Sequence, residues 1–304
     1  MTATTFDHRM ATLESGERLS DSEIRELAAS PDVLTLGMLA DALRRRLRGG
    51  TVTFLRVAVC PFDRPFSDAV LPAAREVLVT GAPPTLDQAA SAVERARAVA
   101  GERTVVAFSW LDVERFAAAG DAGGGPEAVG GVLRTLRQAG LDGLAELPLD
   151  LMAETDAAID RLRSAGFQQL RLTVAAGDVP DRTALWLRAA DLQDRFACIQ
   201  TLNPLPAAPR ASGGATTGYQ DVKTMAAARL AAPNVPSLQV DWARYGPKLA
   251  QVALTFGADD VYGVSAADSS PDGRRRAPLE EIRRNIEAAG LDAVERDGRF
   301  TLAG

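Results

Sequence analysis

Apolar residues along this 304-residue chain recur with two different periods, and the two patterns alternate. Short runs rich in valine, leucine and isoleucine indicate eight strands, and most are followed by a stretch with helical spacing. The predicted strands cover 51–60, 77–80, 104–109, 143–147, 169–175, 197–202, 235–242 and 259–264. The predicted helices cover 86–100, 127–139, 151–165, 182–195, 219–231, 243–256 and 279–289, and their expected ends include Gly140, Gly166, Gly257 and Gly290.

Repeated alternation of strands and helices indicates a parallel sheet. Eight strands in a chain of this length predict an α/β fold, a (β/α)8 TIM-type barrel. A doubly wound open sheet is the alternative, because the number of strands does not show closure. The first unit is short, since only 16 residues, which include Pro61, Pro65 and Pro72, separate the first two strands. That segment has room for no more than a short helix at 67–76.

The first 50 residues predict a helical leader that packs on the barrel, and residues 51–304 predict the barrel itself, within a single domain. Ser20 and Glu23 have the spacing of a capping box at the start of a helix. A second leader helix, over 34–47, ends at Gly49 and carries one leucine stripe: Leu36, Leu39, Leu43 and Leu47.

Composition narrows the classes of function. The chain has 34 basic and 40 acidic residues, a net charge of −6, which argues against a nucleic-acid partner. It has no apolar run of about 20 residues and no apolar core of a signal peptide, so we expect no membrane partner and a cytoplasmic location. The only cysteines are Cys60 and Cys198, and the only histidine is His8. This scarcity predicts no disulfide framework and no metal site, and it argues against a Ser-His-Asp triad.

The most specific pattern lies near the carboxyl end. Residues 217–264 read TGYQDVKTMAAARLAAPNVPSLQVDWARYGPKLAQVALTFGADDVYGV. This run resembles the corresponding part of a radical-SAM family of menaquinone biosynthesis, which comprises aminofutalosine synthase, dehypoxanthine futalosine cyclase and their deazaflavin-cofactor relatives. Upstream, the segments LTLGMLADALRRRLRGGTVTF and AFSWLDVERFA resemble the same family. The resemblance implies a radical-SAM barrel and a place near the futalosine pathway to menaquinone.

The chain departs from this family where the family binds its cofactors. The family carries a CxxxCxxC motif after the first strand, whose three thiolates hold a [4Fe-4S] cluster that binds S-adenosylmethionine. This chain reads FLRVAVCPFDRPFSDAV there, with Cys60 as the one cysteine. Residues 146–148 (Glu-Leu-Pro) replace a glycine-rich turn, and two family histidines are replaced by Asp178 and Asn203. We therefore predict no cofactor, with the family's cluster and S-adenosylmethionine as the alternative.

Polar residues at the carboxyl ends of the strands face the ligand side of such a barrel. Candidates for general acid–base catalysis are Glu146, Asp150 and Asp178. Candidate ligand-binding residues are Ser109, Asp112, Asn203, Asp221, Lys223, Arg229, Asp241, Trp242 and Tyr245. Two alternatives stay open. The charged residues between 221 and 229 either line a pocket or form surface ion pairs and packing contacts. The two aromatic residues either stack on a ligand ring or pack in the core.

These patterns together predict a degenerate radical-SAM-like barrel without radical chemistry. Such a protein binds a futalosine-like or nucleoside intermediate, or it pairs with an active paralogue. The alternatives are an active enzyme of the aminofutalosine synthase or futalosine cyclase type, and a non-radical acid–base enzyme on a related substrate. An unrelated barrel or binding module is a further alternative, against which the long carboxyl-terminal match argues.

Overall fold

A computed structural model describes residues 3–66, 70–120, 124–176, 179, 181–207, 218–269 and 276–302. The strands are β1 (Thr51–Pro61), β2 (Glu76–Thr80), β3 (Thr104–Ser109), β4 (Gly143–Pro148), β5 (Leu170–Val174), β6 (Ile199–Pro206), β7 (Ser237–Asp241), β8 (Asp260–Ser265) and β9 (Asp292–Glu295). The helices are α1 (Ala3–Ser15), α2 (Asp21–Ala29), α3 (Val33–Arg48), α4 (Leu86–Ala100), α5 (Trp110–Ala119), α6 (Pro126–Gln138), α7 (Thr155–Ser164), α8 (Arg182–Phe196), α9 (Gly218–Ala231), α10 (Trp242–Leu254) and α11 (Pro278–Ala288).

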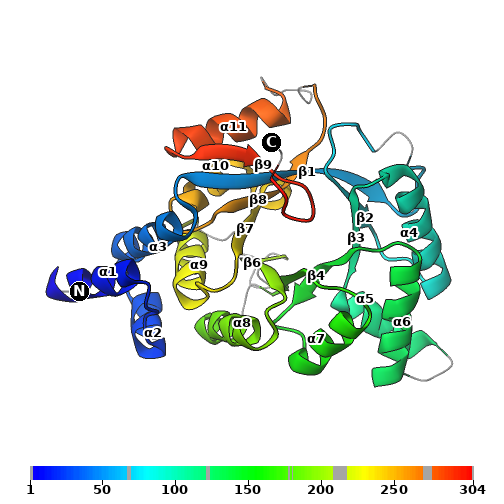
Figure 1. Cartoon of the computed structure of the whole chain (residues 1–304), viewed down its shortest axis with the longest axis horizontal. Coiled ribbons are helices and arrows are strands. Elements are labelled where there is room, and N and C mark those ends of the chain that lie inside the picture. The colour runs from blue at the N-terminus through cyan, green and yellow to red at the C-terminus, as the bar shows by residue number, and fades with distance from the viewer. Residues whose placement is uncertain are drawn as a thin grey trace.

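Strands β1 to β8 form a closed parallel barrel with helices around it (Figure 1). Each strand pairs with the next, and β1 closes the ring by pairing with β8 at Thr53 and with β2 at Val57. The predicted (β/α)8 barrel is therefore confirmed, and the open-sheet alternative is wrong. The predicted helix ends also hold: Gly140 and Gly166 follow α6 and α7 with φ of 105° and 93°, values that favour glycine.

The first strand has a third neighbour, which the sequence pattern did not predict. Strand β9 pairs with residues 51–54 of β1, and β2 pairs with residues 57–61 along the same edge. The short helix predicted at 67–76, in the β1–β2 connection, is wrong over residues 70–76, because 70–75 contain no helix and Glu76 begins β2; residues 67–69 lie outside the described residues. Arg103 fixes this connection by donating hydrogen bonds to the carbonyls of Ala74 and Pro72, at 2.7 and 3.0 Å.

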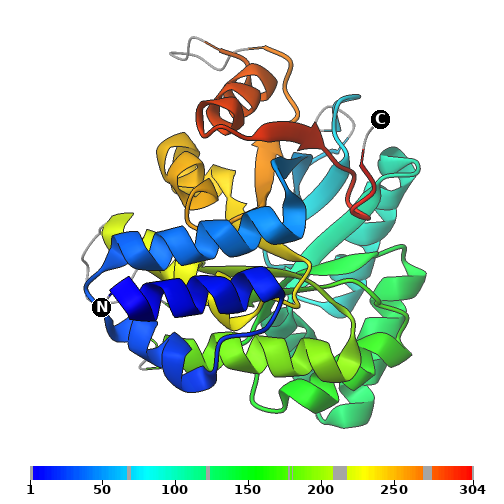
Figure 2. The ribbon, with the colours of Figure 1, turned by 60° about the vertical axis from the view of Figure 1, so that its left-hand side comes forward.

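The amino-terminal segment forms three helices, of which α1 and α3 lie side by side (Figure 2). Ser20 and Glu23 form the predicted capping box at the start of α2. Helix α3 buries three of its four stripe leucines and packs against α9, whereas Leu47 is 39% exposed. Helix α1 was not predicted; its Arg9 is buried and donates to Glu26 at 2.6 Å, which ties α1 to α2.

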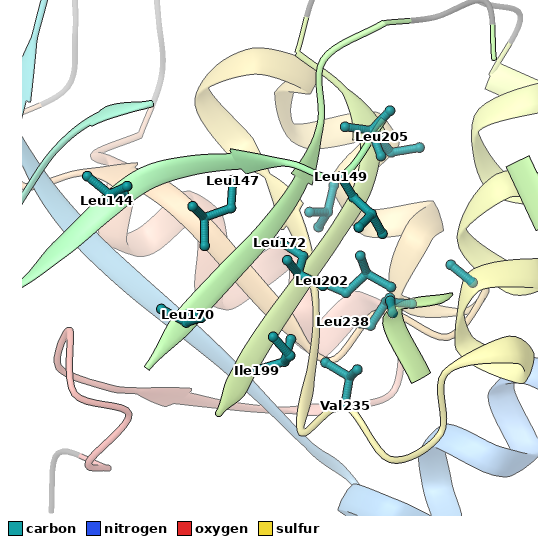
Figure 3. Packing of buried hydrophobic residues seen from close by; sticks show 14 of the residues in the cluster. Leu144, Leu147, Leu149, Leu170, Leu172, Ile199, Leu202, Leu205, Val235 and Leu238 are labelled. Carbon is teal, nitrogen blue, oxygen red and sulfur yellow. The ribbon is translucent and has the colours of Figure 1, made fainter. Parts of the chain in front are cut away.

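The apolar core lies between the strands and the helices outside them. Leu172, Leu202 and Leu238 of neighbouring strands lie in one cluster (Figure 3). Because side chains alternate along a strand, the residues on either side of these leucines face the barrel interior. Those interior positions are largely polar, and they position the candidate site. No helix in the described part of the chain combines the length and apolar character needed to cross a membrane.

Candidate functional site

A buried ion pair crosses the barrel near the amino ends of its strands. The Arg171 guanidinium on β5 donates two hydrogen bonds to Glu76 on β2, one of them at 3.0 Å. The hydroxyls of Tyr262 and Thr104 donate to the same carboxylate at 2.9 and 3.3 Å. These four side chains come from four strands, so their network forms a floor that closes the barrel interior near the amino ends. Barrels of this kind bind ligands at the opposite face, where the carboxyl ends of the strands lie.

A second buried pair joins the floor to the segment after β9. Arg296 donates two hydrogen bonds to Asp260 on β8, at 2.6 and 2.7 Å, and both side chains are almost completely buried. Thr53 and Gln239 donate to the same carboxylate, each at 2.6 Å. Burial by itself would raise the pKa of Asp260, but Arg296 and these hydrogen bonds hold that pKa below its ordinary value.

An ion pair bridges the mouth at the carboxyl ends of the strands. Arg244, in the first turn of α10 after β7, donates to Glu146 of β4 at 3.0 Å. Strands β5 and β6 lie between β4 and β7, so the pair spans their carboxyl ends. These strands carry Thr173 and Asn203, both buried. The Thr173 hydroxyl has no hydrogen-bond partner among the described residues, whereas the Asn203 amide oxygen accepts from Leu205 at 3.4 Å.

Asp241 lies beside this ion pair, and its pKa is raised. Its carboxylate caps α10 by accepting a hydrogen bond from the Arg244 amide at 3.0 Å. Burial raises the pKa of Asp241, and the positive charge of Arg244 offsets only part of that effect. A carboxyl group that holds its proton more readily than a surface aspartate is suited to general acid–base chemistry.

A kink in α10 places the residues that follow β7. Gly246 has φ 76° and ψ 171°, a combination that side chains disfavour, and Pro247 starts the second part of the helix. The short first part holds Tyr245, whose hydroxyl donates to the carbonyl of Pro206 on β6. Burial raises the pKa of Tyr245, which keeps the phenol protonated as a donor.

Three further predicted site residues, Ser109, Asp112 and Asp150, form structural contacts at the mouth. Ser109 and Asp112 form a capping box for α5, in which the Ser109 amide and hydroxyl both donate to Asp112 at 2.9 Å. Asp150 accepts the backbone N–H groups of Ala175 and Ala176, at 2.9 and 2.8 Å. Its carboxylate therefore joins the end of β4 to the end of β5. Asp178 lies outside the described residues.

The other predicted residues fall into separate places. Arg229, at the far end of α9, is buried and pairs with Asp259 at 2.6 Å near the amino ends of the strands, away from the mouth. Asp221 is buried near the start of α9, and Lys223 is partly exposed. Trp242 is buried in the apolar core cluster, as the packing alternative expects. The structure thus leaves Arg229 apart and brings seven of the predicted residues to one mouth: Ser109, Asp112, Glu146, Asp150, Asn203, Asp241 and Tyr245.

The cysteines do not match the donor set of an iron–sulfur cluster. Cys60 is buried near the carboxyl end of β1, and Cys198 is buried just before the amino end of β6, so the two thiols lie at opposite ends of the barrel. Burial raises the pKa of both thiols, which disfavours the thiolate that binds metal. The described residues also contain no group of three histidine, cysteine or acidic side chains placed to hold a metal ion.

Sequence patterns missed two residues of the mouth. Thr173 lies within an apolar strand pattern, and its one signal was the alternation that turns it toward the interior. Arg244 stands between two candidates, Asp241 and Tyr245, but its partner lies 98 residues away in the chain. Only the order of the strands brings Arg244 and Glu146 together.

Comparison with known proteins identifies relatives that match parts of the chain. No family model matches it. The chain is 27% identical over 202 residues to aminodeoxyfutalosine synthase of Thermus thermophilus, covering 56% of this chain and 54% of that protein. It is 33% identical over 94 residues to the 5-amino-6-(D-ribitylamino)uracil–L-tyrosine 4-hydroxyphenyl transferase of Archaeoglobus fulgidus, covering 29% and 27%. The chain thus spans about half the length, or less, of these curated relatives.

Solved structures share the fold over most of the chain. Methylornithine synthase superimposes with a TM-score of 0.64 at 14% identity, over 94% of this chain and 97% of that one. HydG, a maturase of the [FeFe]-hydrogenase, gives a TM-score of 0.62 at 14% identity, over 96% and 76%. At these identities the likeness concerns the barrel and its surrounding helices.

Proposed function

We propose that this chain is a degenerate member of the radical-SAM family of the menaquinone pathway, a proposal that its similarity to aminodeoxyfutalosine synthase and to the 4-hydroxyphenyl transferase supports. In this proposal the barrel works without its own [4Fe-4S] cluster and S-adenosylmethionine chemistry. It acts in the cytoplasm, where it binds a futalosine-like or nucleoside intermediate of the pathway at its mouth. Pairing with an active paralogue is the second form that this role can take.

The number and the positions of the cysteines are the main support for this proposal. The family's cluster needs three thiolates on one loop. Cys60 and Cys198 are the only cysteines of the chain, and they lie buried at opposite ends of the barrel. Burial raises the pKa of both thiols, and this disfavours the thiolate form that would bind iron. We therefore assign no step to a cluster.

The ion pair at the mouth is a second, independent observation that supports the same proposal. Residues 146–148 stand where the resemblance places a glycine-rich turn that approaches the cofactor. Glu146 instead extends a side chain to Arg244 and bridges the mouth. Backbone can approach a ligand closely where glycine leaves space, and a glutamate in an ion pair fills that space. Among the residues that the structure describes, none partners the Thr173 hydroxyl, which can bond a polar group of a ligand.

Iron counting after anaerobic reconstitution with iron and sulfide tests the proposal. We expect no stoichiometric iron and no absorbance near 400 nm. A Cys60→Ala variant should behave like the wild type. About four irons per chain, with cleavage of S-adenosylmethionine, would refute the proposal and would identify an active enzyme of the aminofutalosine synthase or futalosine cyclase type.

Binding at the mouth has its own test. Futalosine should raise the melting temperature of the protein, because a ligand that binds the native state stabilises it. A Thr173→Val variant, which removes the hydroxyl and keeps the shape, should lose most of that increase, whereas Thr173→Ser should retain it. An equal increase in all three proteins would exclude a role for this hydroxyl.

Asp241 favours a second candidate function, non-radical acid–base catalysis on a related substrate. Its raised pKa and its place beside Arg244 suit a proton donor. If this function is correct, iron-free protein converts a futalosine-type nucleoside, and Asp241→Asn loses that activity while the exposed Asp87→Asn keeps it. Activity that survives in Asp241→Asn would exclude Asp241 as the acid.

A further inference from the structure

A cavity lies at the base of the barrel, at the end opposite the mouth. It has a volume of about 370 Å³ and lies between the amino ends of β3 to β5 and the turn that follows β9. Three arginines and one carboxylate line it: Arg137, Arg171, Arg299 and Asp142. In Figure 1 the turn after β9 (red) hangs beside β9 over the end of the barrel. The proposed function does not use this cavity.

The charges around the cavity do not balance. Glu76 neutralises Arg171. Asp142 is shared by two guanidinium groups, those of Arg97 and Arg137, so one positive charge remains there. Arg299 is exposed and forms no ion pair with any described residue, so it adds a second positive charge to the lining; the Asp297 carboxylate of the same turn accepts backbone amides and does not line the cavity. A concave site with an excess of guanidinium groups attracts oxyanions and can hold them by paired hydrogen bonds.

The turn that carries Arg299 is rigidly held. The Asp297 carboxylate accepts the amides of Arg299 and Thr301, each at 2.8 Å. Phe300 adopts φ 64°, which is unfavourable for a phenylalanine, and its ring lies 3.9 Å from the Arg296 guanidinium. Strained residues persist where the surroundings hold them and cluster at functional sites.

The base of the barrel leaves room for this turn only because of a glycine. A Cβ on Gly298 would lie 1.7 Å from the Thr104 hydroxyl oxygen and 2.7 Å from a carboxylate oxygen of Glu76. The backbone therefore rests directly on the floor of the barrel, with Arg299 as the next residue. Across the cavity, Gln168 has an exposed side-chain amide with no hydrogen bond to a described residue.

We propose that this cavity is a binding site for a small polyvalent oxyanion, with Arg299 and Arg137 as its cationic contacts and Gln168 as a neutral donor. The volume suits a small metabolite that carries two or three anionic groups. Phosphate esters and polycarboxylates share this chemistry. Because the site joins the turn after β9 to the base of β3 to β5, its occupant holds that turn against the barrel.

Isothermal titration calorimetry with pyrophosphate and, separately, citrate tests the proposal. We expect saturable binding of at least one of them at one site per chain, and the tighter binder identifies the source of the anion. Arg299→Gln should weaken binding about tenfold or more, because it removes a charged hydrogen-bond donor. Arg134→Gln is the matched control, because Arg134 is exposed on the same helix as Arg137 and does not line the cavity; it should bind as the wild type does.

Two results would overturn the proposal. One is no saturable binding of either anion up to about 10 mM, beyond the range of weak specific affinity. The other is the same weakening in Arg299→Gln and Arg134→Gln, which would show a general effect of net charge. Melting temperatures of both variants in the absence of anion verify that the fold is retained. Neither iron content nor binding at the mouth enters this test, so it stands apart from the proposed function.

Discussion

Replacing Arg296 with methionine tests how the segment after β9 is held in the barrel. Methionine fills much of the same volume but leaves the Asp260 carboxylate buried without its cation. Both partners of this pair are at most 1% exposed. Breaking a buried pair by removing one partner costs about 3–5 kcal/mol of unfolding free energy, because the remaining charge is uncompensated.

The unfolding free energy that Arg296→Met loses should depend on pH. The folded-state pKa of Asp260 lies below its ordinary value. Its stabilising contribution is therefore complete above the unfolded pKa of about 3.9 and is lost as pH falls through the folded-state pKa. The difference in unfolding free energy between wild type and Arg296→Met should be largest near neutral pH. It should shrink as pH falls, because the buried Asp260 of the folded variant lacks its cation and takes up a proton at higher pH than the wild type does.

Urea unfolding followed by circular dichroism at neutral and acid pH measures the loss of unfolding free energy and its dependence on pH. Arg284→Met, an exposed change on α11, serves as the control and should shift the unfolding free energy by less than about 0.5 kcal/mol. The double variant Asp260→Asn/Arg296→Met should recover part of the loss, since it removes the stranded charge. A cost below about 1 kcal/mol for Arg296→Met at neutral pH, or a cost that does not fall in acid, would refute the reasoning.

Three further changes have defined outcomes. Gly246→Ala should cost about 1–3 kcal/mol in urea unfolding, because alanine disfavours φ 76° with ψ 171°, and an unchanged midpoint would contradict the strain argument. Asp150→Ala should cost about 1–3 kcal/mol by leaving two amides without their acceptor, which the conservative Asp150→Asn should partly rescue. Cys60 should react with iodoacetamide at neutral pH only as fast as the protein unfolds, since burial both covers the thiol and raises its pKa; rapid labelling of native protein would disprove this.

Local patterns in the sequence were sufficient for the barrel and for the argument about cofactors. Alternation of strands and helices predicted all eight barrel strands, and the spacing of Ser20 and Glu23 predicted a helix start. The number and spacing of cysteines already argued against a three-thiolate cluster. These features depend on neighbouring residues or on composition, and both are visible in one dimension.

The tertiary structure decided which polar residues meet. Glu146 and Arg244 are 98 residues apart, and Glu76 and Arg171 are 95 apart. Each pair forms only because strand order and register place their elements across one barrel. The sequence made Asp150 a candidate for acid–base catalysis, and the structure adds that its carboxylate accepts two backbone amides of the β5 end. Strand β9 was missed for the same reason: four residues have little pattern of their own, and β9 is defined by its pairing with the free edge of β1.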